Sequence, residues 1–135
     1  MVRACFGWLL GVALGGVAAF VLVVAVELFS AVVHPFPDDF SGSEEQMCEH
    51  VANYPAWVLA VIVPMWSAVA WSATWVAGRI GGLVAAVTIG VLLLAALALN
   101  LSMLPYPMWF KLVQPLMVVV AIGLVWRRTM AGSRG

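Results

Sequence analysis

Long runs of apolar residues dominate the pattern along this chain, and four of them have the length of a membrane-spanning helix. They lie at about residues 6–33, 55–77, 83–104 and 108–126. A helix needs about 20 such residues to cross the hydrocarbon core of a bilayer. Stretches such as VLLLAALAL do not alternate apolar with polar residues, as the strands of a membrane barrel do. We therefore expect an all-α integral membrane protein: a single domain, residues 1–135, built as a four-transmembrane-helix bundle.

One polar segment, residues 34–54, separates the first two runs. Its first part, HPFPDDFSG, is rich in the Pro and Gly residues that end helices. Its second part, SEEQMCEHVANYP, predicts a short helix with Ser43 as the N-cap and Gln46 in the capping-box position. Apolar side chains recur on one face of that helix, at Met47, Val51 and Tyr54. We expect the helix to lie on the outer membrane surface or against the mouth of the bundle.

The composition strengthens the membrane interpretation. Hydrophobic residues make up 65% of the chain and charged residues 9%, against roughly 25% charged residues in an average soluble domain. So few charges cannot cover the surface of a water-soluble protein of this size, and the lipid bilayer is therefore the expected solvent and partner. The formal net charge is zero. A chain without a basic field is not expected to bind nucleic acid.

The positions of Lys and Arg predict the orientation. If the chain crosses four times, all its arginines fall on one side: Arg3, Arg79, Arg127, Arg128 and Arg134. The single lysine, Lys111, falls on the other side. Because an excess of Lys and Arg marks the cytoplasmic side, we expect both termini in the cytoplasm and residues 34–54 outside. The abundance of Ala, Val and Gly, with Arg favoured over Lys, indicates a GC-rich bacterial genome and therefore a bacterial inner (plasma) membrane.

Small residues recur every four positions on two of the expected spans. They are Gly7, Gly11 and Gly15 on the first span and Gly82, Ala86 and Gly90 on the third. Helices in lipid associate where small residues let their backbones approach closely. The two series are expected to hold the bundle together within one chain. An alternative is that Gly7, Gly11 and Gly15 join copies of the chain in a homo-oligomer. Trp66, deep in the second span, is expected to pack against a neighbouring helix.

Polar side chains interrupt three of the spans at a similar depth. Counted from the outer ends of the spans, they are Glu27, Asn100, Lys111 and Gln114. At about 1.5 Å per residue these side chains share one intramembrane layer, roughly 5–10 Å below the outer surface. Because an ionised group is costly at that depth, we predict an ion pair between Glu27 and Lys111, with the two amides completing the hydrogen bonds. Alternatively, Lys111 extends to the outer headgroups on its own.

His34 lies two turns above Glu27 and about 20° away in helical phase. Because His titrates near neutral pH, it is a candidate entrance for a proton path to Glu27. The plainer interpretation, which we favour, is an interfacial His at the end of a helix. Together with Cys48 and His50 it is also a candidate metal ligand. On a helix, however, the spacing of Cys48 and His50 points the two side chains in different directions, so no bound metal or other cofactor is expected.

Motifs of known enzymes are not recognisable in the chain. It has no Ser–His–acid context and no phosphate-binding loop, so we do not expect an enzyme. The leading hypothesis is a small non-enzymatic membrane protein with an accessory or structural role. The first alternative is a proton- or cation-coupled small transporter or channel that uses Glu27. The second is a metal- or redox-active membrane protein that uses His34, Cys48 and His50. A transporter requires a cavity that reaches Glu27, whereas a structural role requires Glu27 to be sealed against a polar neighbour.

Overall fold

Four helices make up the described part of the chain. The structure is a computed structural model that describes residues 2–132, and the side chains of residues 5–132. The helices are α1 (Val2–Val33), α2 (Glu44–Ala52), α3 (Ala56–Met103) and α4 (Met108–Gly132), and residues 2–132 contain no strand. Three of them, α1, α3 and α4, are long and apolar enough to cross a membrane. The expected all-α class is therefore confirmed, with three candidate membrane helices.

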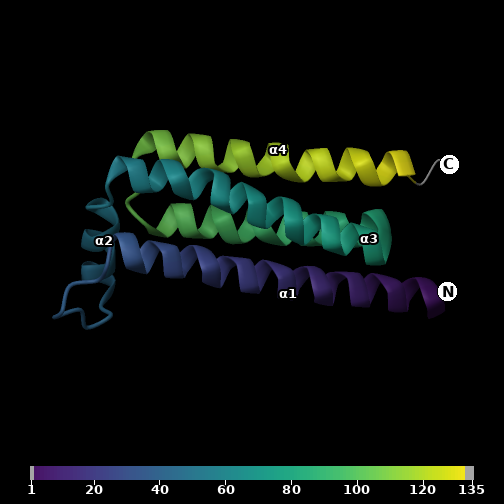
Figure 1. The fold of residues 1–135 in the computed structure, drawn as a ribbon, viewed down its shortest axis with the longest axis horizontal. Coiled ribbons are helices and arrows are strands. Elements are labelled where there is room, and N and C mark those ends of the chain that lie inside the picture. Colours follow the sequence, from purple (N-terminus) through teal and green to yellow (C-terminus); the bar gives the residue numbers. More distant parts are fainter. Residues whose placement is uncertain (1, 133–135) are drawn as a thin grey trace.

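α3 is 48 residues long because it contains two of the predicted spans. It reverses direction at Gly82, whose φ of 72° and ψ of −169° are non-helical. A positive φ favours glycine, which has no Cβ to clash with the backbone. Figure 1 shows that residues 56–81 and 83–103 lie side by side and run in opposite directions. The reversal lies within the sequence AGRIGG and makes the two halves of α3, which contain the second and third expected spans, antiparallel neighbours.

The two halves of α3 lie between α1 and α4. Both outer helices pack against α3, and within residues 2–132 they do not pack against each other. The start of α1, the end of α4 and the turn at Gly82 lie at one end of the bundle (Figure 1). α2 lies across the opposite end (Figure 1). The chain thus passes along the bundle four times.

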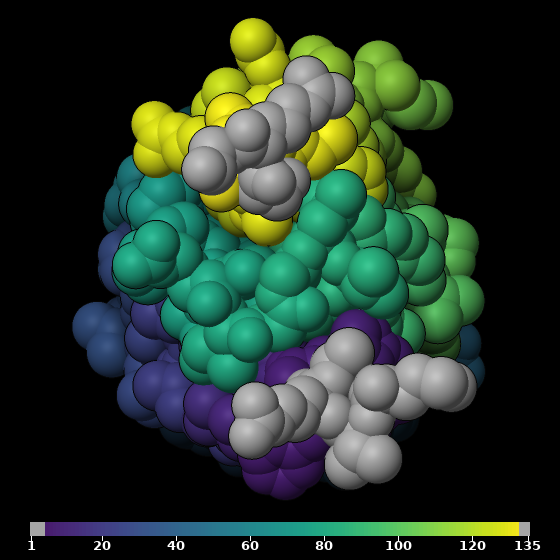
Figure 2. All heavy atoms as spheres, turned by 90° about the vertical axis from the view of Figure 1, so that its right-hand side faces the viewer, coloured from purple at the N-terminus to yellow at the C-terminus, as the bar shows by residue number. Residues whose placement is uncertain are grey.

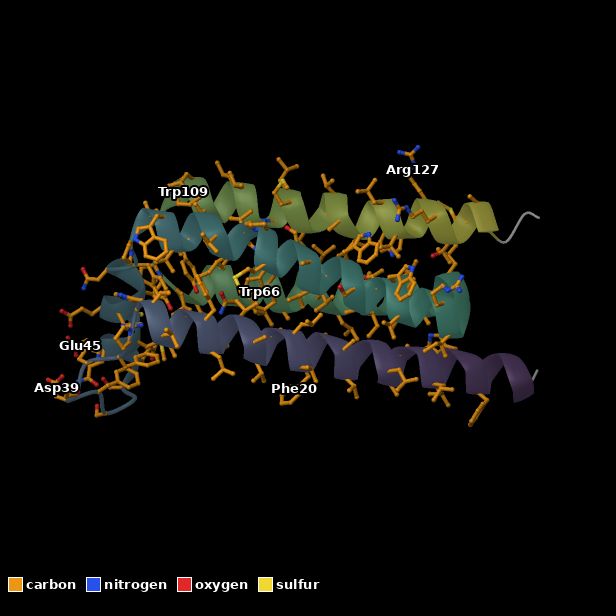
Figure 3. The ribbon with its side chains drawn as sticks, in the orientation of Figure 1. Phe20, Asp39, Glu45, Trp66, Trp109 and Arg127 are labelled. Atoms are coloured by element: carbon orange, nitrogen blue, oxygen red, sulfur yellow. The ribbon has the colours of Figure 1, made fainter. Side chains whose placement is uncertain are left out.

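Charged side chains divide between the two ends of the bundle. We call the end near Gly82 the arginine end, because it carries Arg79, Arg127 and Arg128. We call the opposite end the acidic end, because it carries Asp38, Asp39, Glu44, Glu45 and Glu49. Figure 3 shows Arg127 toward one end and Asp39 and Glu45 at the other. The side chain of Arg3 and the whole of Arg134 lie outside the described residues.

α1 packs on α3 through glycines near the arginine end. A methyl group placed on Gly11 would lie 2.7 Å from the Cα of Gly81. One placed on Gly15 would lie 2.8 Å from the Cβ of Ala77. Only glycine allows two helix backbones to approach this closely, and Figure 2 shows α3 lying between α1 and α4 at this end. Gly11 and Gly15 therefore contact the same chain, and a second copy on this face would have to displace α3.

α4 packs on the second half of α3 through the other predicted series. A methyl group placed on Gly90 would lie 2.9 Å from side-chain atoms of both Ile122 and Trp126. The indole Nε1–H of Trp126 donates a hydrogen bond to the carbonyl of Ala86, at 3.3 Å. Gly82 has no neighbouring atom within 4 Å of a methyl group placed on it. Ala86 and Gly90 are therefore packing positions, whereas Gly82 acts through its backbone conformation.

α2 begins where the sequence predicts it. The hydroxyl of Ser43 accepts a hydrogen bond from the backbone N–H of Gln46, at 3.3 Å, which satisfies one of the free donors at the helix start. The side-chain carbonyl of Gln46 accepts from the backbone N–H of Ser41, at 2.7 Å. In a capping box that second bond returns to the N-cap residue itself. The N-cap and the position of Gln46 are therefore as predicted, and the side chain of Gln46 bonds to Ser41 instead of to the N-cap residue.

Large apolar side chains cover the outside of the three long helices. Phe20 on α1 is 70% exposed, Val84 on α3 is 68% exposed and Leu116 on α4 is 62% exposed. Figure 3 shows Phe20 pointing away from the bundle. Soluble monomers rarely expose contiguous apolar patches of more than a few hundred Å². The surface is therefore the kind expected of helices that are surrounded by lipid.

Candidate functional site

A cavity of about 500 Å³ lies between the helices near the acidic end. All four helices contribute to its lining, including both halves of α3. We call it the polar cavity, after the polar side chains that line it: Glu27, Ser30, His50, Tyr54, Asn100, Tyr106 and Gln114. Its volume falls within the range of about 300–1,000 Å³ that is usual for small-molecule sites.

The polar cavity extends well below α2. On α1 its lining runs from Val23 to Ser30, and on the first half of α3 from Leu59 to Trp66. Each of these stretches covers seven residue steps, which corresponds to about 10 Å along a helix at about 1.5 Å per residue. The cavity therefore reaches into the part of the bundle that the apolar surface surrounds.

Glu27 lies at the margin of the α1 face that is turned toward the bundle. Its neighbours Val26 and Ser30 are 4% and 5% exposed, whereas the Glu27 side chain is exposed and lines the polar cavity. Among the described side chains, Glu27 and Lys111 form no ion pair at N–O distances up to 4.0 Å. The predicted pair is therefore absent, and the carboxylate is accessible to a molecule in the cavity.

Lys111 differs from the other residues of the predicted polar layer. Glu27, Asn100 and Gln114 all line the polar cavity, but Lys111 does not. At about 100° per residue, Lys111 lies roughly 60° round α4 from Gln114. Residue counts predict how deep a side chain lies along its helix, but they do not predict toward which neighbouring helix it projects. The predicted layer therefore combines three side chains of one site with a fourth that lies outside it.

Gln114 is the most deeply buried polar residue of the cavity. Its side chain is 0% exposed, and neither Oε1 nor Nε2 has a hydrogen-bond partner. An unpaired buried polar group costs about 1–3 kcal/mol, so such groups are rare in a folded chain and call for an explanation. Because Gln114 lines the polar cavity, its amide is available to a molecule bound there.

His50, on α2, covers the cavity from the acidic end. It is 7% exposed, and its Nε2 has no hydrogen-bond partner. Its ring is stacked between Phe36, at a centroid distance of 4.2 Å, and His34, at 4.3 Å. Burial lowers the pKa of His50, and the charge of His34 lowers it further. The imidazole is therefore neutral at pH 7.

His34 follows the end of α1 and does not line the polar cavity. It lines a second cavity, of about 290 Å³, and His50 lines both. The Nε2–H of His34 donates to the backbone carbonyl of His50, at 3.3 Å. Tyr54 contacts both imidazoles, at centroid distances of 4.5 Å and 5.4 Å. His34 therefore helps to hold α2 in place, and His50 is the histidine that reaches the polar cavity.

Two tyrosines, Tyr54 and Tyr106, complete the part of the site that is nearest the acidic end. The hydroxyl groups of Ser30 and Tyr54 share a hydrogen bond, which links α1 to the connection between α2 and α3. Burial raises the pKa of Tyr106 to about 12, and the charges of Tyr54 and Glu27 contribute to the increase. The Tyr106 hydroxyl therefore stays protonated at neutral pH and keeps a proton to donate. Tyr106 lies in the short connection before α4, and no pattern in the sequence indicates a role for it.

The charge of the cavity is set by a single residue. Glu27 is the one carboxylate in its lining, and no Lys or Arg belongs to that lining. Aromatic rings from the loop between α1 and α2, from α3 and from α4 form part of the wall: Phe36, Trp66 and Phe110. Trp66 therefore lines a site as well as packing against a helix, as was expected of it. A negative group beside aromatic faces favours cations and disfavours anions.

A metal centre has little support in this arrangement. Among residues 5–132, no three His, Cys, Asp or Glu side chains are grouped so that they would hold a metal ion. His34 and His50 are stacked face to face instead of converging on one point. Cys48 is a free, half-buried thiol. The metal or redox hypothesis therefore gains no ligand set from the structure.

Comparison of the chain with models of known protein families, with curated proteins and with solved structures gives no match. The case for a function therefore rests on the polar cavity.

Proposed function

We propose that the chain is a small four-span membrane protein whose polar cavity takes up a proton or a cation, with Glu27 as the ionisable group. This is the transporter or channel hypothesis. One observation carries it: the exposed carboxylate of Glu27 lines a cavity of about 500 Å³ and has no ion pair with Lys111. A carboxylate inside a membrane bundle is costly, by about 2.5 kcal/mol or more near the helix centre. Such groups usually have a functional reason.

The accessory or structural hypothesis makes a different demand on the same residue. A carboxylate kept for architecture is expected to be sealed against a partner, because an unpaired buried charge destabilises the fold. Glu27 is instead exposed beside Asn100 and Tyr106 in the cavity lining. The transporter hypothesis therefore accounts for Glu27 better than the structural one.

The distribution of charge supports an orientation for this activity. The arginine end carries Arg79, Arg127 and Arg128, and an excess of Arg marks the cytoplasmic side of a membrane. In that orientation both termini are cytoplasmic, and α2 covers the outer mouth of the polar cavity. The bacterial plasma membrane is the proposed location. The acidic side chains around α2 would raise the local concentration of cations near that mouth.

Flux through the purified full-length chain in liposomes tests the proposal. Proton uptake is followed with an enclosed pH-sensitive dye, and uptake of Na⁺ and K⁺ with radioactive tracers. We expect Glu27→Gln to abolish the flux while the protein keeps its helical circular-dichroism spectrum. Glu45→Gln is the matched control, because it removes an exposed carboxylate of α2 that does not line the cavity. It lowers the acidic charge near the mouth by one side chain and should therefore keep most of the flux. A wild-type chain without flux, or equal flux in Glu27→Gln, would overturn the proposal.

A further inference from the structure

A proton or a bare cation cannot satisfy both hydrogen-bonding groups of the Gln114 side chain. Its amide offers both a hydrogen-bond donor and an acceptor, and both are unpaired in a side chain that is 0% exposed. A metal ion or an ammonium group can satisfy the carbonyl oxygen but not the NH₂ group. An occupant that satisfies both atoms must itself carry an acceptor beside a donor, as a carboxamide does.

Three features from three helices surround the same space. Glu27 on α1 provides the negative charge, Gln114 on α4 provides the paired donor and acceptor, and Trp66 on α3 provides an aromatic wall. His50 adds a further unpaired ring nitrogen from the side of α2. The remaining lining is mainly apolar, with side chains such as Ile62 and Leu97. Such walls do not coordinate an inorganic cation, but they do bury the body of an organic one.

We propose that the polar cavity binds an amphipathic organic amine that also carries a carboxamide-like group. Its protonated nitrogen pairs with Glu27, its donor and acceptor pair with Gln114, and its apolar body lies along the aromatic wall. This inference rests on the proposed function, because it names the class of cation that the site takes up. Glu27 lies six residues before the end of α1 at Val33, and Gln114 lies six residues after the start of α4 at Met108. The two polar groups of the molecule therefore contact different helices at a similar depth.

The absence of Lys and Arg from the lining determines which related molecules are rejected. A carboxylate or a phosphate would lie beside the charge of Glu27 without any cation to compensate it. A neutral amide would satisfy Gln114 but gain nothing from Glu27. A simple amine would satisfy Glu27 but leave both polar atoms of Gln114 unpaired. The site therefore selects for the combination of the two groups.

Three indoles serve as probes for the two polar contacts. The first, 5-carboxamidotryptamine, carries both an ammonium group and a carboxamide. Tryptamine lacks the carboxamide, and indole-5-carboxamide lacks the amine. Binding of each probe to the full chain in detergent micelles is measured by isothermal titration calorimetry, with micelles alone as the blank. The comparison of the three probes on the unmodified protein needs no variant to fold.

We expect the probe with both groups to bind about tenfold more tightly than either of the others, since a pair of buried hydrogen bonds is worth about that factor. Gln114→Met removes the amide at similar volume. It should weaken the carboxamide probes about tenfold and leave tryptamine unchanged. Glu27→Gln should weaken the two amines and leave indole-5-carboxamide unchanged. Lys111→Met, on the same helix but outside the lining, should change none of the three.

Two outcomes would overturn the inference. The first is equal binding of all three probes to wild type and to Gln114→Met, which indicates partition onto the apolar surface and a Gln114 amide that water satisfies. The second is no binding of any probe. Glu27-dependent flux of protons or Na⁺ without probe binding would keep the proposed function and reject the organic amine. Selective probe binding without any flux would keep the organic amine as the ligand and reject the proposed uptake function.

Discussion

The arginine end and the acidic end of this bundle are built from different side chains. At the arginine end, Gly11 and Gly81 bring the backbones of α1 and α3 together so closely that an added methyl group would lie 2.7 Å from its neighbour. At the acidic end, residues with long polar or aromatic side chains surround a cavity of about 500 Å³. Both regions lie on the same helices, so one pair of elements is tightly packed at one end and separated at the other.

The difference has a physical reason. Between helices in lipid there is little hydrophobic gain from association, so stability depends on close van der Waals contact between backbones. The arginine end provides such contact. The acidic end instead leaves Gln114 and His50 with unpaired polar atoms, which costs stability. Stability and the candidate site are thus separated along the axis of the bundle, and variants at the two ends should behave differently.

The largest effect is expected at Gly11. Gly11→Ala would place a methyl group 2.7 Å from the Cα of Gly81, and overpacking of this kind typically costs about 1–3 kcal/mol. The free energy of unfolding, measured by denaturant titration of the full chain in mixed micelles, should fall by that amount. Because helix backbone forms this contact, no side-chain rotation relieves it.

Gly16 provides the control for this prediction. It lies on the same helix, and a methyl group placed on it has no neighbour within 4 Å. Gly16→Ala should therefore be neutral or should stabilise the helix by about 0.5–1 kcal/mol, the usual difference between the two residues in a helix interior. Equal effects of the two substitutions would show that α1 and α3 are not in close contact at the arginine end.

The next effect has the opposite sign and lies at the acidic end. Gln114→Met removes an unpaired buried amide at similar volume, so the free energy of unfolding should rise by about 1–2 kcal/mol. Thr74→Val is the control within the packed part of α3, because the Thr74 hydroxyl is also 0% exposed and unpaired but does not line the cavity. Both should stabilise the chain, and only Gln114→Met should change binding. A destabilised Gln114→Met would indicate that the amide has a structural partner.

The packing of the arginine end can be predicted from the sequence more fully than the lining of the cavity at the acidic end. Spacing of glycines every four residues identifies packing faces directly, and Gly11, Gly15 and Gly90 lie at helix contacts. The cap at Ser43 follows from local chemistry in the same way. Such features depend on residues that are close together in the sequence or on one helix face, so a periodic pattern is sufficient to predict them.

Which residues line the polar cavity depends on how neighbouring helices are oriented toward one another. The sequence of a single helix does not determine that orientation. Residue counts identify the depth of Glu27, Asn100 and Gln114, but they also include Lys111, which points elsewhere. His50 was considered only as a metal ligand, although its spacing of three residues from Met47 places both on one face of α2, the helix that covers the cavity. That face is a signal the sequence contains. The role of Tyr106 is not visible there, because it depends on how α3 and α4 approach α1.

A smaller effect concerns pH at the acidic end. Because burial lowers the pKa of His50 from 6.5 in the folded chain, the unfolded chain binds more protons just below pH 6.5. Stability is therefore full above that pH and falls as the pH decreases through the lowered pKa. The thermal midpoint in detergent, measured between about pH 8 and 5, should decrease on the acid side.

The variants of the two stacked histidines separate the causes of this slope. His50→Gln should flatten the dependence. His34→Gln should keep most of it, since burial is the larger cause of the shift and the charge of His34 the smaller. An unchanged slope in His50→Gln would assign the acid sensitivity to another group.

The smallest expected effect is the coupling between Glu27 and Lys111, and its absence is itself informative. In a double-mutant cycle with Glu27→Gln, Lys111→Met and both together, the free energies of unfolding should add to within about 0.5 kcal/mol, as they do for residues without a shared partner. A buried ion pair behaves differently, because removing one partner leaves an uncompensated charge that costs about 3–5 kcal/mol and removing both recovers much of it. Coupling of that size would mean that Glu27 belongs to the architecture of the bundle, as the glycines of the arginine end do. Additive effects would show that Glu27 has no energetic coupling to Lys111. Because no Lys or Arg lines the polar cavity, the positive partner of Glu27 would then be a cation that enters the cavity.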